Sequence, residues 1–156
     1  MPQFSDRLAA AVRRCGTPTL VGLDPRVESL PRGLRPTESG FDACAVAYRR
    51  FCRDVIDVVA GRVPAVKPQA AFFEQLGPAG MAALADVIQH ARANDLLVIL
   101  DGKRNDIGST STAYAQAYLG SKSAWGCDAL TISPYLGDDS LQPFVDQAIA
   151  HDSGIF

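Results

Sequence analysis

The sequence has few of the residues and motifs that indicate a metal site, a nucleotide cofactor or a disulfide framework. Only two of its 156 residues are histidine and four are cysteine, and no two cysteines form a C-x-x-C pair. We therefore expect Cys15, Cys44, Cys52 and Cys127 to be reduced core residues, with no zinc site. Neither G-x-G-x-x-G nor G-x-x-x-x-G-K-[ST] occurs, so dinucleotide-binding and P-loop folds have little support.

Long apolar runs and a strong charge of one sign are also missing. No apolar run approaches the ~20 residues that span a bilayer. The amphipathic start of the chain contains Asp6 and does not resemble a secretory signal. Fifteen basic and 17 acidic residues give a net charge of −2, which creates no attraction to nucleic acid or to an anionic membrane. We expect a cytoplasmic protein with neither kind of partner.

The composition, 47% hydrophobic and 21% charged, is typical of a globular protein, and we expect one domain over residues 1–156. Hydrophobic periodicity predicts helices in alternation with strands. The first helix would be capped by Ser5, reach Arg14 and stop at Gly16. The other helices are expected over residues 41–60, 78–94, 106–119 and 141–150. The strands are expected over residues 19–23, 65–67, 96–100 and 129–132, and residues 154–156 look like the beginning of a fifth.

This alternation predicts βαβ units and a parallel sheet. Two architectures fit the pattern, an open doubly wound sheet and a (β/α)8 barrel. In both, the carboxyl ends of the strands carry the active site. Each predicted strand ends in polar residues, which are Asp24, Lys67, Asp101 with Lys103, and Thr131 with Ser133.

The densest group of charges follows the third strand, in ILDGKRNDIGST. Asp101 and Lys103 are two residues apart, so an extended segment would project both side chains to the same side. Asp106 would open the next helix, where its carboxylate is favoured. Lys103 would thus lie between two carboxylates, which favour its protonated form. That arrangement suits a general acid and not a Schiff-base lysine.

Simpler explanations exist for some of these residues. Asp106 taken alone could be only a helix cap, and Asp24, which precedes Pro25, could be only a turn former. Lys67 is harder to explain in this way. It lies in the otherwise apolar stretch PAVKPQAAFF, and lysine is rarely buried without a partner.

Taken together, these segments resemble orotidine 5′-phosphate decarboxylases. DGKRNDI resembles the D-x-K-x-x-D-I signature of that family, and VGLDP resembles its first-strand motif. AVKPQAAFFEQLG and DALTISPYLGDDSL resemble the second-strand and fourth-strand segments of one bacterial subgroup. Magnesium-dependent sugar-phosphate enzymes share D-x-K-x-x-D but tend to have an acidic residue near the position of Lys67. Lys67 therefore favours the decarboxylase.

The resemblance implies a role for each matching residue in converting orotidine 5′-phosphate to uridine 5′-phosphate in pyrimidine synthesis. Lys103 would donate a proton to C6 of the pyrimidine, and Asp101 would face the substrate carboxylate in a charged chain with Lys67 and Lys103. Asp106 would reach into the site of the neighbouring subunit. The substrate-binding residues would be Asp24, Lys67, Ile107 and Thr110. The family implies a homodimer without metal or organic cofactor.

The fold that the resemblance implies is a (β/α)8 barrel, which takes ~250 residues. We expect this chain to be the N-terminal part of such an enzyme, truncated after about four βα units and weak or inactive alone. The arginine that grips the substrate phosphate would lie beyond it. Two alternatives remain open. One is a non-catalytic half-barrel that self-associates, with its first and fourth strands as open edges. The other is a magnesium-dependent sugar-phosphate lyase of the same superfamily.

Overall fold

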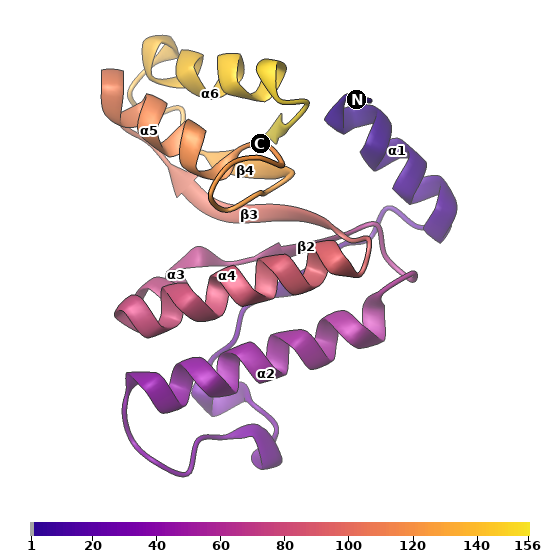
Figure 1. Ribbon diagram of the computed structural model, residues 1–156, viewed down its shortest axis with the longest axis vertical. Helices are drawn as coiled ribbons and strands as arrows, with labels where there is room; N and C mark the ends of the chain where they lie inside the picture. Colours follow the sequence, from indigo (N-terminus) through magenta and orange to yellow (C-terminus); the bar gives the residue numbers. More distant parts are fainter. Residues whose placement is uncertain (1) are drawn as a thin grey trace.

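A five-stranded parallel sheet lies at the centre of the computed structural model, which describes residues 2–156 (Figure 1). The strands are β1 (Val21–Leu23), β2 (Ala65–Pro68), β3 (Leu97–Arg104), β4 (Ala129–Ile132) and β5 (Gly154–Ile155). They lie side by side in the same order as in the sequence. A doubly wound sheet reverses its strand order at a switch point, so this topology is that of a (β/α)8 barrel.

One helix precedes β1, and the others connect each strand to the next. They are α1 (Phe4–Cys15), α2 (Phe41–Val59), α3 (Ala70–Glu74), α4 (Gly77–Ala93), α5 (Gly108–Tyr118) and α6 (Asp138–Ala150), with the short 3-10 turns η1 (Val27–Ser29) and η2 (Arg32–Leu34) after β1. In the described residues, none of the helices has the length and apolar character needed to cross a membrane. The predicted order of elements is confirmed, with boundaries that differ by a few residues.

Some local predictions were wrong. Ser5 does not cap α1, because the helix begins at Phe4, with Gln3 at the cap position, and Ser5 already lies in its first turn. Asp106 does not open α5, which begins at Gly108 after Ile107. The short helix α3 was not predicted, because its five residues are fewer than the two turns that hydrophobic periodicity needs. Gly16, in contrast, ends α1 in the left-handed conformation that the sequence indicates.

The fifth strand was expected to begin only at the end of the chain, but β5 is formed and pairs with β4. Ala129 is opposite Gly154, and Leu130 is opposite Ile155. The expectation that the fourth strand is an open edge is therefore wrong, because β1 and β5 are the edges of the sheet.

The two faces of the sheet are buried against different partners. Val66, Val98, Leu100 and Leu130 point toward α2, α4, α5 and α6 and belong to the main hydrophobic core. The large side chains of this core include Phe73, Leu84, Ile88 and Phe144, each almost fully buried. Because successive side chains on a strand alternate between faces, the residues between these core positions point to the inner side of the curved sheet.

Helix α1 covers one end of this inner side (Figure 1). Phe4 packs with three strand residues, Ala65, Ile99 and Ala129, and we call these four residues the inner apolar layer. Arg7 ties the helix to the sheet: its guanidinium lies 2.5 Å from the Asp128 carboxylate. The inner side is therefore apolar and covered at the amino ends of the strands.

Candidate active site

Two residues beyond the inner apolar layer, β2, β3 and β4 carry polar side chains on the same face. Lys67, Asp101 and Thr131 come two residues after the strand members of that layer. The period of two places them on the same inner face, nearer the carboxyl ends of the strands. β2, β3 and β4 are neighbours in the sheet, so the three side chains meet.

Asp101 is at the centre of this group, and both of its carboxylate oxygens are fully used. Oδ2 accepts hydrogen bonds from Lys67 Nζ at 2.7 Å and from Gln69 Nε2 at 3.0 Å. Oδ1 accepts them from Lys103 Nζ at 2.5 Å and from Thr131 Oγ1 at 2.9 Å. We call these five residues the Asp101 cluster. Two ammonium groups and one carboxylate give the cluster one net positive charge.

The ionised form of Asp101 is strongly favoured. Burial alone would raise the pKa of this carboxyl group, because its side chain is only 9% exposed. Hydrogen bonds from Lys103, Lys67 and Thr131 outweigh burial and lower the pKa from its ordinary value of 3.8 to about 2. Asp101 is therefore a permanent anion at neutral pH, and it holds both lysines in place.

This lowered pKa makes the stability of the chain depend on pH. Asp101 contributes about 2 kcal/mol to the free energy of unfolding above pH ~5, and this contribution declines as pH falls toward 2, where the folded state also takes up the proton. We expect Asp101→Asn to lower the free energy of unfolding at pH 6, and the gap from the parent to narrow by roughly 1 kcal/mol at pH 3. Urea unfolding at both pH values measures this gap, and a gap of constant size would contradict the assignment.

Lys103 reaches Asp101 through an irregular backbone and not through the extended segment that the sequence suggested. Its φ is +46°, in the left-handed region that non-glycine residues rarely adopt. The register between β3 and β4 shifts here, with Leu100 opposite Leu130 but Arg104 opposite Ile132. The predicted proximity of Asp101 and Lys103 is confirmed, but it arises through this irregular stretch of β3, residues 101–103, which we call the bulge because it re-aims a side chain as a β-bulge does.

The other predicted site residues make no hydrogen bond or ion pair with Asp101 in the described part of the chain. Asp24 follows β1 directly and is exposed. Asp106 is half-buried, and its Oδ1 accepts a hydrogen bond from the Ile107 amide at 2.8 Å. Ile107 is 61% exposed, and Thr110 is exposed one turn further along. Lys103 was expected between two carboxylates, but among residues 2–156 it pairs with Asp101 alone.

Two members of the cluster were missed or left without a role. Gln69 was not singled out, although it lies two residues after Lys67 and its position follows from the same period of two. Thr131 was recognised only as a polar strand end. Its hydroxyl donates to Asp101 and accepts the Lys103 amide at 2.9 Å, which depends on strand register and cannot be deduced from spacing.

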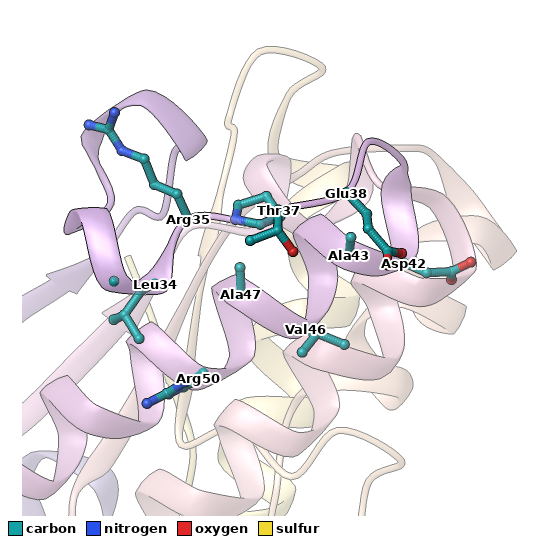
Figure 2. A pocket seen from close by; sticks show the side chains of 11 residues that line it. Leu34, Arg35, Thr37, Glu38, Asp42, Ala43, Val46, Ala47 and Arg50 are labelled. Carbon is teal, nitrogen blue, oxygen red and sulfur yellow. The ribbon is translucent and has the colours of Figure 1, made fainter.

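A separate shallow pocket of about 400 Å³ lies on the outside of the molecule (Figure 2). The segment after β1 and one side of α2 form it, with Leu34, Thr37, Glu38, Val46 and Arg50 among its lining residues. It shares no residue with the Asp101 cluster. We place the candidate site at the cluster, because charged groups converge there on a carboxylate whose pKa is lowered.

The donor set offers little to a metal ion. Among residues 2–156, no group of three or more histidine, cysteine, aspartate or glutamate side chains is arranged to hold one. The four cysteines are free, and burial raises the pKa of the Cys52 and Cys127 thiols to about 12. These two buried cysteines are therefore neutral core residues, as the sequence indicated.

Known proteins that are similar to this chain belong to one family. The family model for the orotidine 5′-phosphate decarboxylase / HUMPS family matches residues 18–156. An orotidine 5′-phosphate decarboxylase of Rhodopirellula baltica is 60% identical, in an alignment that covers 100% of this chain and 54% of the relative. One of Streptomyces coelicolor is 43% identical, with the same coverage. The chain spans about half the length of these curated relatives.

Solved structures show the same similarity. Leishmania donovani OMP decarboxylase superposes with a TM-score of 0.75 and 36% sequence identity, over 99% of this chain and 52% of that protein. Leishmania donovani UMP synthase superposes with a TM-score of 0.77 and 36% identity, over 100% of this chain and 30% of that protein. The superposition extends over the whole sheet and its helices.

Proposed function

Because this chain belongs to the orotidine 5′-phosphate decarboxylase / HUMPS family, we propose that its Asp101 cluster decarboxylates orotidine 5′-phosphate to uridine 5′-phosphate, with Lys103 as proton donor. One observation carries the proposal. The Lys103 ammonium is held 2.5 Å from a buried carboxylate, while its side chain remains 66% exposed on the inner side of the sheet. It is both fixed in position and accessible to a substrate.

The chemistry needs such a group. When the bond between C6 and the carboxylate carbon breaks, the electron pair stays on C6 and carbon dioxide leaves. A fixed ammonium beside C6 stabilises the developing negative charge. Lys103 then transfers a proton to C6, and the neutral amine regains a proton from solvent. No cofactor is needed for this sequence of bond changes.

Asp101 and Lys67 prepare Lys103 for this step. The anionic Asp101 holds both ammonium groups, so the cluster needs little rearrangement as charge develops. Its net positive charge attracts the anionic substrate. The Asp101 carboxylate would face the substrate carboxylate, and departure of carbon dioxide would relieve the repulsion between the two. Lys67 and Asp24 would bind the ribose hydroxyls.

The site would be completed by a second copy of the chain in a homodimer. Asp106 makes no ion pair in the described residues, and Ile107 next to it exposes a large apolar surface. An exposed apolar side chain beside a carboxylate without an ion pair suits a position at an interface between subunits. We propose that Asp106, Ile107 and Thr110 reach the substrate bound to the partner copy.

The magnesium-dependent alternative is less well supported by the cluster. Each Asp101 oxygen already accepts two hydrogen bonds, two of the four from ammonium groups at 2.7 and 2.5 Å. These positive charges would repel a divalent cation, which prefers several free carboxylate and carbonyl oxygens. Lys67 occupies a position where a magnesium site would favour an acidic residue.

A direct assay tests the proposal. Since the chain spans about half the length of its relatives, we define a completed barrel, in which residues 1–156 are joined to the part of the Rhodopirellula baltica relative that they do not cover. The completed barrel should convert orotidine 5′-phosphate to uridine 5′-phosphate, monitored by ultraviolet absorbance, equally well with EDTA or with magnesium. The Rhodopirellula baltica relative is the control. A folded barrel that is inactive, or active only with magnesium, would refute the proposal.

A further inference from the structure

Arg104 lies next to Lys103 on the other side of β3 and is anchored between two helices. Its Nη2 pairs with Glu74 at the end of α3 and donates to the Tyr118 hydroxyl of α5 at 3.2 Å. Its guanidinium carbon lies 5.5 Å from the Tyr114 ring centroid and 5.4 Å from that of Tyr118. The side chain is only 18% exposed. Ion pairing and stacking on aromatic rings both use the planar guanidinium.

This anchoring carries a cost in stability. The Nε of Arg104 is buried and has no hydrogen-bond partner in the described residues. A buried donor without a partner destabilises the folded chain. An exposed lysine or glutamine at this position would avoid the cost, so the stability of the helices alone does not account for Arg104.

The bulge that precedes Arg104 must be stabilised by contacts with other elements of the fold. The left-handed φ of Lys103 makes this backbone less favourable than a regular strand. The Lys103 side chain is mostly exposed, so its own packing does little to hold it. Thr131 Oγ1 of β4 accepts the Lys103 amide, and the amide of Ser133, the residue after β4, donates to the Arg104 carbonyl, both at 2.9 Å. These contacts restrain the backbone from one side only.

We propose that Arg104 is a positioning residue, which holds the bulge from the side of α3 and α5 and so keeps the Lys103 ammonium on Asp101. The contacts place Lys103 on the inner side, at Asp101, and Arg104 on the helix side, at Glu74, so an anchor on Arg104 fixes the direction of Lys103 without entering the substrate site. The catalytic part of this inference rests on the proposed function. The geometric part concerns the chain itself and is tested without substrate.

The chain contains three lysines, Lys67, Lys103 and Lys122, so an amine-acylating reagent followed by peptide mapping reports on each of them. Lys122 is exposed and serves as the internal standard. We expect Arg104→Met to raise the labelling of Lys103 relative to Lys122 by roughly fivefold, as the Lys103–Asp101 hydrogen bond weakens. Lys67 labelling should change little, because its bond to Asp101 is not part of the bulge.

Matched variants distinguish a positioning role of Arg104 from a general loss of rigidity in the folded chain. Arg53→Met removes another arginine–carboxylate pair, to Asp86 at 2.9 Å between α2 and α4. It should leave the labelling of Lys103 relative to Lys122, which we call the Lys103 ratio, unchanged. Arg104→Lys keeps the charge but loses the planar fork, so it should give an intermediate ratio. Glu74→Gln weakens the same anchor while Arg104 stays, and it provides a second variant if Arg104→Met does not fold.

In the completed barrel, Arg104→Met should lower kcat by about 10- to 100-fold and change KM by less than about twofold, because the proton donor is displaced and the substrate contacts remain. An unchanged Lys103 ratio in Arg104→Met and Glu74→Gln, or an equal rise at Lys67, overturns the inference even if the barrel decarboxylates. If Arg104→Met selectively raises Lys103 labelling but the parent barrel shows no turnover, the proposed function is refuted and the positioning role stays intact.

Discussion

Replacing Lys103 with alanine should reduce decarboxylation by the completed barrel by at least about 100- to 1,000-fold, while the protein stays folded. The rate loss follows from removing the charge that stabilises the carbanion at C6 together with the proton that quenches it. The fold should survive because the Lys103 side chain is mostly exposed, and Asp101 keeps three hydrogen-bond donors from Lys67, Gln69 and Thr131. Single-turnover kinetics measures the chemical step directly.

The matched control for this experiment is Lys122→Ala, which removes an exposed lysine outside the cluster. It should retain parental kcat and KM. Far-UV circular dichroism and urea unfolding should show that both variants fold like the parent. Near-normal turnover by a folded Lys103→Ala variant would remove Lys103 from its role as proton donor.

Two inactive variants should restore activity when they are combined, if the site is shared between two subunits. Lys103→Ala removes the proton donor, and Asp106→Asn removes the carboxylate that we propose to act in the partner copy. Random association gives heterodimers as half of all dimers, and one of their two sites contains both original residues. The mixture should therefore recover about a quarter of the parental activity. Co-expression of the two completed barrels, followed by the decarboxylation assay, measures this recovery.

The structure supplies a control for this experiment as well. Lys67 and Lys103 bind the same Asp101 within one chain, so Lys67→Ala combined with Lys103→Ala should recover nothing. Asp106→Asn is preferred to alanine because an amide oxygen can still accept the Ile107 amide. Failure of the Lys103→Ala and Asp106→Asn pair to recover activity, with dimers confirmed by light scattering, would place Asp106 outside the partner's site.

Much of the site could be predicted because a parallel sheet gathers the ends of its strands. The apolar runs that end at Lys67 and Asp101 predicted two neighbouring strands, and the parallel pairing of β2 and β3 brings both side chains to one face. The prediction for Asp106 was less successful. A carboxylate near a helix start suggests a cap, but α5 begins two residues later, because local preference at a helix end is weak compared with packing.

Periodicity along the chain was sufficient for the order of helices and strands, for their parallel pairing and for the clustering of Lys67 with Asp101. These properties depend on the spacing of apolar and polar residues along the chain, which can be read directly from the sequence. The barrel order of the strands, the bulge at Lys103, the hydroxyl of Thr131 and the anchor between Arg104 and Glu74 required the folded chain. Each depends on register or on a contact between residues roughly 30 positions apart, and the free energy of such contacts is settled only when the whole sheet packs.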